Sequence, residues 1–184
     1  MRRSRMAAVA ATVVGVAGFA AAVTVAGDSK RDFETGMLGY EEVPAVSTTG
    51  NGQVDVEVAR DGQSLKFVLR YRALESPVTQ SHIHFGQKDV NGGISIFFCS
   101  NLGNGPAGTP PCPQPAPGEY AEVEGTRTAA DMAAPAAAQG IAPGEFAELV
   151  RALRAGVAYA NVHSSQFPAG EIRGQFDRRG HQED

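Results

Sequence analysis

Apolar and polar side chains alternate along residues 52–74. Valines there take alternate positions with acidic residues between them, and the alternation resumes after the pair Asp61-Gly62 with Leu65 and Phe67. A period of two is typical of a strand that buries one face. Asp-Gly favours a tight turn, so this segment predicts an antiparallel hairpin.

Other short segments show strand signals and are separated by turns rich in Gly, Pro and Asn. They are residues 33–40, 81–86, 94–100, 119–128, 157–164 and 170–176. An Ala-rich stretch at 129–140, interrupted by Pro135, predicts only a helical turn or a loop. We therefore predict an all-β fold, an antiparallel sandwich or barrel of about seven strands of the immunoglobulin or superoxide dismutase kind.

One helix is predicted near residues 144–155 and is inserted into this fold. Its apolar residues lie at positions i, i+3, i+4 and i+7, which places them on one helical face: Phe146, Leu149, Val150 and Leu153. Gly156 follows and favours the end of the helix.

The first 27 residues have the composition of a targeting segment. Three arginines precede a long uncharged run that ends in small residues, which indicates either a signal peptide cut before Asp28 or an N-terminal membrane anchor. We expect one β domain over residues 28–177 and a disordered tail at 178–184. Either reading of the first segment predicts a secreted or extracytoplasmic location, at the cell surface or in the periplasm, with membrane contact only through that segment if it is not cleaved.

Cys99 and Cys112 are the two cysteines of the sequence. In an exported protein an even pair favours a disulfide, here closing a loop rich in Gly and Pro. Closing a loop of this size contributes ~3 kcal/mol in the chain-entropy model. Two distant thiols without a nearby histidine make a poor zinc signature.

The charge and the motifs exclude several classes of function. The chain of 184 residues has a formal net charge of -4, which gives no basic field to attract nucleic acid. It contains no nucleophile elbow and no P-loop lysine pattern. We therefore expect no catalytic activity, and a redox role like that of superoxide dismutase is the one enzymatic alternative.

Strand parity places several polar residues on one side of the sheet. In the segment Ser81–Gly86, Ile83 and Phe85 share one face and His82 and His84 share the other. If the apolar pair enters the core, both imidazoles point outward. The same argument turns these residues of the two last predicted strands outward: Tyr159, Asn161, His163, Glu171, Arg173 and Gln175.

Two interpretations of this patch remain open. In the first, Asn161, Glu171, Arg173 and Gln175 form with the histidines a polar network that holds the ends of the domain together, and no cofactor is bound. In the second, His82, His84 and His163 bind copper or zinc, for which neutral imidazole is a common ligand.

Four motifs of the chain resemble the CHRD domain. They are LGYEEVPAV, HIHFG, YANVHS and PAGEIRGQF, in this order. The resemblance, to CHRD proteins of the bacterial secreted type, implies an extracellular all-β module with no agreed chemistry. We expect a binding or structural module for a protein or cell-envelope ligand that the sequence does not identify. Growth-factor binding is not implied, because the chain lacks the cysteine-rich repeats of chordins.

Overall fold

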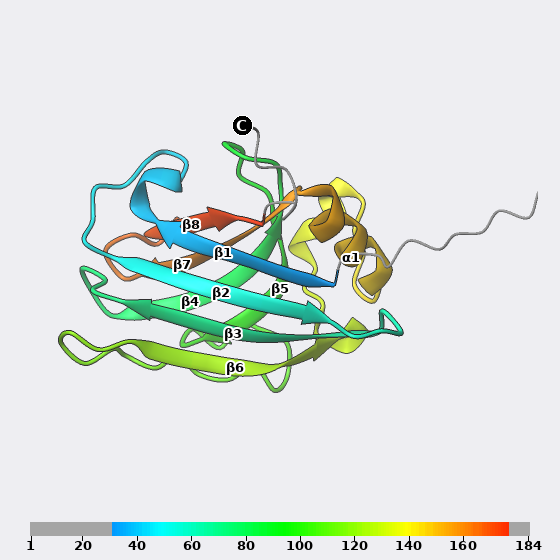
Figure 1. Ribbon diagram of the computed structural model, residues 1–184, viewed down its shortest axis with the longest axis horizontal. Coiled ribbons are helices and arrows are strands. Elements are labelled where there is room, and N and C mark those ends of the chain that lie inside the picture. Colours follow the sequence, from blue (N-terminus) through cyan, green and yellow to red (C-terminus); the bar gives the residue numbers. More distant parts are fainter. Residues whose placement is uncertain (1–30, 177–184) are drawn as a thin grey trace, which may run out of the picture.

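The computed structural model describes residues 31–176, which form a nearly closed antiparallel barrel (Figure 1). Its single sheet has the strand order β5-β4-β7-β8-β1-β2-β3-β6. The strands are β1 (Asp32–Leu38), β2 (Asn51–Val58), β3 (Ser64–Arg72), β4 (Val78–Phe85), β5 (Gly93–Ser100), β6 (Ala121–Thr128), β7 (Ala158–Ser164) and β8 (Ile172–Gln175). The all-β prediction is confirmed, with eight strands.

The predicted hairpin is β2 and β3. Val54 pairs with Leu69 and Val56 with Phe67, and all four side chains are buried in the barrel core. Gly62 lies in the connecting turn with a positive φ of 70°, a conformation that glycine adopts at low cost. Alternation alone was sufficient here, because one face of the hairpin is buried along its whole length.

Helix α1 (Phe146–Ala155) lies at one end of the barrel (Figure 1). The four apolar residues of its predicted face are all buried, as expected: Phe146, Leu149, Val150 and Leu153. Gly156 ends the helix in the left-handed conformation, with a φ of 70°. Three short 3-10 segments complete the helical content described: Gly39–Glu41, Ala129–Asp131 and Pro135–Gln139.

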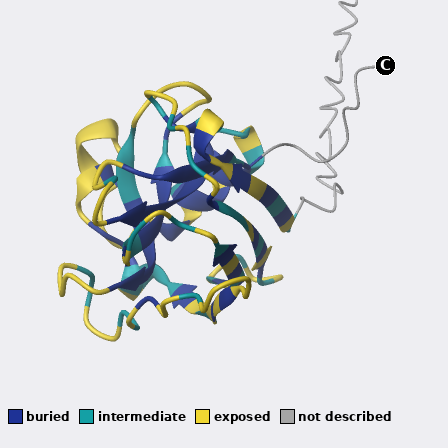
Figure 2. Cartoon of the chain, turned by 90° about the vertical axis from the view of Figure 1, so that its left-hand side faces the viewer, coloured by how far each residue is buried: buried dark blue, intermediate teal, exposed yellow. Residues whose placement is uncertain are grey.

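The targeting segment and the tail, residues 1–27 and 178–184, lie outside the described residues. Within residues 31–176 no helix has the length and apolarity needed to cross a membrane. Exposed residues concentrate in the loops, whereas the strands are largely buried (Figure 2).

Arg127 connects the two strands at the ends of the sheet order, β5 and β6. Its Nε donates to the carbonyl oxygen of Phe97 at 2.9 Å, and its Nη2 donates to that of Phe98 at 2.9 Å. The guanidinium also lies 5.1 Å from the centre of the Phe67 ring. A side chain thus satisfies carbonyl groups that a neighbouring strand would otherwise satisfy, and this brings the barrel close to closure.

The predicted disulfide between Cys99 and Cys112 is present. Both cysteines are buried, and the segment after Cys112 is held by Tyr71, whose hydroxyl donates to the carbonyl oxygen of Pro113 at 2.7 Å. Asn101 donates to the carbonyl oxygen of Cys112 at 2.9 Å. The loop between the cysteines is therefore fastened against the β5 side of the barrel.

Replacing Arg127 should open the barrel between β5 and β6. We expect Arg127→Ala to lower the free energy of unfolding by about 2–4 kcal/mol, because two carbonyl groups lose their donors. The stability of Arg127→Lys should lie between those of the wild type and Arg127→Ala, because an ammonium group lacks the planar fork of donors of a guanidinium. Urea unfolding measures the change, with Arg70→Ala as the control: Arg70 forms exposed ion pairs and should contribute within about 1 kcal/mol. Equal effects of Arg127→Ala and Arg70→Ala would contradict this role.

Candidate metal centre

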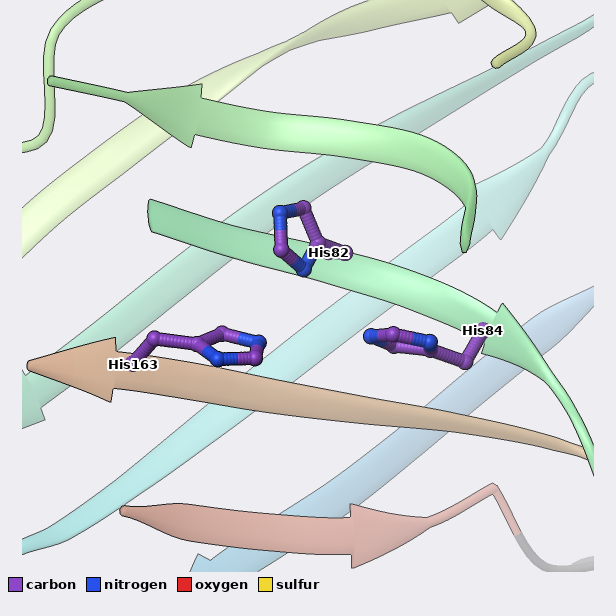
Figure 3. Close-up of side chains that lie close together, drawn as sticks. All are labelled: His82, His84 and His163. Atoms are coloured by element: carbon purple, nitrogen blue, oxygen red, sulfur yellow. The ribbon is translucent and has the colours of Figure 1, made fainter. Parts of the chain in front are cut away.

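Three histidines of two neighbouring strands lie together (Figure 3). β4 carries His82 and His84, and β7 carries His163. Ile83 lies in the hydrophobic core, so the imidazoles occupy the opposite face of the sheet, as parity predicts. This face is nevertheless closed to solvent, because His82, His84 and His163 are only 0%, 7% and 5% exposed. The expected outward surface is therefore a second, polar interior.

Loops cover this polar face. Arg173 of β8 donates to the carbonyl oxygens of Gln87 at 3.2 Å and Val90 at 2.9 Å, and to Oδ1 of Asn91 at 3.2 Å. Asn91 in turn donates from Nδ2 to the carbonyl oxygen of Val43 at 2.8 Å. The loop after β4 is thus tied both to β8 and to the segment after β1, and together they exclude water from the histidines.

Two of the histidines have one ring nitrogen fixed by the backbone. Nδ1 of His84 lies 2.9 Å from the carbonyl oxygen of Gly92, and Nδ1 of His163 lies 3.0 Å from that of Pro168. Each carbonyl can only accept, so each Nδ1 carries the proton and donates it. In a neutral ring Nε2 then holds a free lone pair. This backbone-fixed tautomer is the usual arrangement of histidines that ligate metals.

His82 lies beside these two rings and has no polar partner. Both of its ring nitrogens are buried and without a hydrogen bond. The centre of its ring is 4.8 Å from that of His163 and 5.2 Å from that of His84. Phe97 contacts its ring edge-on at 4.4 Å. A buried imidazole with two unsatisfied nitrogens is costly unless a ligand is bound to it.

The environment keeps all three rings neutral. Burial lowers the pKa of His82 well below its usual 6.5, and the neighbouring His163 and His84 lower it further. Burial likewise lowers the pKa of His84 to about 4 and lowers that of His163. Neutral imidazole is the form that binds metal ions. One ligand atom from each ring lies within 4.8 Å of the other two.

The other predicted network residues surround the histidines and hold the backbone. Glu171 accepts from Thr48 Oγ1 at 2.7 Å and from the backbone nitrogen of Glu75 at 2.8 Å. Gln175 donates from Nε2 to three carbonyl oxygens, those of Gly86, Gly156 and Ala158. Asn161 is different, because its Oδ1 lies 3.0 Å from Nε2 of both His84 and His163.

Glu42 is a site residue that the sequence did not identify. It lies in a segment that reads as a turn, yet its side chain is 6% exposed and its Oε1 has no partner. Burial raises its pKa to about 7, although the positive charge of Arg173 opposes this shift. Gly170 leaves room for it, because a Cβ there would collide with the carboxylate. Two adjacent acids before a proline were the only signal.

Tyr159 is the second residue whose role was missed. Strand parity predicted that Tyr159 lies on the histidine face, but it did not predict the contacts of the ring. Its ring stacks on that of His84 with centres 4.6 Å apart and an angle of 2° between the planes. The guanidinium of Arg173 lies over the Tyr159 ring, 3.5 Å from its centre. Its hydroxyl accepts from the backbone nitrogen of Gly92 at 3.1 Å.

These features define a class of protein: an antiparallel barrel with a buried histidine cluster beneath loops on the outer face of its sheet. The chain belongs to the CHRD domain family, whose model matches residues 33–176. The match covers the four motifs that carry the resemblance in the sequence and confirms the family. Comparison with curated proteins found no match, and neither did comparison with solved structures.

Acid should destabilise the metal-free protein. The unfolded chain takes up histidine protons near pH 6.5 and the folded chain only near pH 4 for His84, so stability is lost as the pH falls between these values. Protonation of His84 alone should lower the free energy of unfolding by on the order of 3 kcal/mol when the pH falls through this whole range. Glu42 acts oppositely between pH 4.5 and about 7, since its folded-state pKa is raised, but it is one group against three histidines.

Urea midpoints measured with a chelator from pH 7.5 to 4.5 test this expectation. Glu42→Gln should make the loss steeper, because it removes the one contribution that grows on acidification. A flat profile between pH 7 and 5 would show that the three rings are not held neutral by burial.

Proposed function

We propose that this CHRD domain binds one metal ion through His82, His84 and His163. The observation that carries the proposal is His82, fully buried with both nitrogens unpartnered between two histidines whose Nδ1 atoms are fixed by the backbone. Strands β4 and β7 bring three imidazole nitrogens together. Burial keeps the rings neutral and excludes the water that would compete for the metal.

The donor set favours zinc or copper. Three imidazole nitrogens suit Zn²⁺ and copper, whereas Ca²⁺ and Mg²⁺ require mainly oxygen ligands. Metal–nitrogen bonds of about 2.0–2.1 Å need the ligand atoms to converge further than their present spacing of up to 4.8 Å. Small rotations of the three rings supply this movement, because each ring is attached to a rigid strand through two side-chain torsions.

A purely structural network explains the surrounding residues but not the centre. Arg173, Gln175 and Glu171 bond to loop backbone, which supports the architectural interpretation for them. Glu171 and Gln175 each keep one buried oxygen without a partner, but their other side-chain atoms are bonded, whereas His82 makes no hydrogen bond through either ring nitrogen. We therefore assign the architectural role to the outer residues and metal binding to the histidines. Both roles fit a module that presents its surface to a partner.

Metal titration tests this function. The purified chain, stripped with a chelator, should bind one equivalent of Zn²⁺ or Cu²⁺ at micromolar Kd or tighter and gain thermal stability in excess metal. His82→Ala should weaken binding at least about 100-fold, since losing a ligand costs more affinity than losing a residue that only orients a ligand. His181→Ala, which removes the remaining histidine of the sequence, is the matched control and should leave binding unchanged.

Binding weaker than about millimolar, or binding that His82→Ala leaves intact, would overturn the proposal. The His84→Ala and His163→Ala variants supply independent ligand deletions if His82→Ala folds poorly. Far-UV circular dichroism of each variant without metal shows whether a loss of affinity arises from a loss of fold.

We also propose that the domain functions outside the cytoplasm. The disulfide, the family and the N-terminal composition support this location. Mass spectrometry of the chain recovered from an exporting host should find a mature form that begins at Asp28 and carries an oxidised Cys99–Cys112 pair. A full-length chain with free thiols in the cytoplasmic fraction would contradict export.

A further inference from the structure

We infer that Asn161 supplies a fourth ligand through Oδ1. The inference rests on the proposed metal site and extends it to a closed, four-coordinate centre. Asn161 lies on β7 opposite His82, and it is 2% exposed. Its Oδ1 is 3.0 Å from Nε2 of His84 and 3.0 Å from Nε2 of His163.

The positions of the protons argue for a cation at this point. Because Nδ1 of His84 and of His163 donates to a backbone carbonyl, each neutral ring has an unprotonated Nε2. Oδ1 of Asn161 therefore faces two nitrogen lone pairs with no proton between them. Three acceptor atoms that converge in a buried site repel one another unless a positive ion joins them.

The amide of Asn161 is placed with its oxygen, not its nitrogen, toward the two rings. With the opposite orientation, the amide nitrogen would donate to both Nε2 atoms and no ion would be needed. The placement in the structure leaves these acceptors without a donor, which a bound cation would satisfy.

The spacing fits a tetrahedral site. Ligand atoms about 2.0–2.2 Å from one ion lie about 3.4 Å apart when arranged tetrahedrally. The two distances from Oδ1 of Asn161 are 3.0 Å, already close to this value. Three nitrogens and one oxygen complete a four-coordinate shell, and closed shells are typical of metal sites without a substrate position.

Access from solvent agrees with a closed centre. A pocket of about 200 Å³ lies against the loops that cover the site, and it is lined by Glu42, Pro168 and Gly170 among others but by none of the three histidines. A small ligand that entered it would meet the carboxylate of Glu42. With four protein ligands in place, the metal would have no free coordination position for an external anion.

Azide binding to the Cu²⁺-loaded chain tests this inference. Wild-type protein should show no azide-to-copper charge-transfer band, because all four positions are filled. Asn161→Ala should open one position and develop the band, and Asn161→Ser should do the same, since a serine oxygen is too short to reach the ion. Asn161→Asp keeps an oxygen ligand and should remain closed to azide. Asn104→Ala, at an exposed asparagine, is the matched control.

The possible results separate the two proposals. If wild-type protein binds no metal, the proposed function fails and this inference fails with it. If it binds one ion but azide reaches wild type and Asn161→Ala equally, the three-histidine centre stands and Asn161 is not a ligand. Should both Ala and Ser variants fail to fold, an azide band in Asn161→Asp overturns the inference and its absence supports it.

Discussion

The guanidinium of Arg173 is the contact on which the polar interior depends. It binds the loop after β4 through the carbonyl oxygens of Gln87 and Val90, and it lies over the ring of Tyr159. Tyr159 in turn stacks on His84, so cation and rings form one column. Because this loop ends in the carbonyl group that fixes Nδ1 of His84, the buried arginine determines the burial, the orientation and the tautomer of that ring.

Two kinds of buried polar group meet on this face, and their hydrogen bonds distinguish them. Arg173, Glu171 and Gln175 are joined to backbone groups of the covering loops, which offsets their desolvation. One oxygen each of Glu171 and Gln175 stays without a partner, but His82 lacks a partner at both ring nitrogens, and Oε1 of Glu42 lacks one as well. Groups of the first kind hold the structure in place, and those of the second remain costly until a further charge or ligand interacts with them.

The sequence was sufficient for the strands and the helix, where burial is periodic. The β2–β3 hairpin and α1 follow from alternation and from the 3.6-residue period, because each buries one regular face. The closure of the barrel by Arg127 was not predictable, since an arginine within a strand reads as an exposed residue. Parity also assigned His82 and His84 to the correct face, but burial of that face comes from loops without a period.

The motif PAGEIRGQF shows why only part of the site could be predicted from the sequence. Each of its polar residues forms hydrogen bonds with a segment distant in the sequence. Glu171 bonds to the segment before β2, Arg173 bonds to the loop after β4, and Gln175 bonds to backbone at the ends of three elements. Gly170 leaves space for the carboxylate of Glu42, which the motif itself does not contain. A motif on one strand gives the residue types but not the partners that they contact in other segments. The histidines could therefore be recognised as a candidate site, whereas Glu42 could not. The physical meaning of this motif is therefore the attachment of covering loops, and the buried, neutral histidine cluster is its consequence.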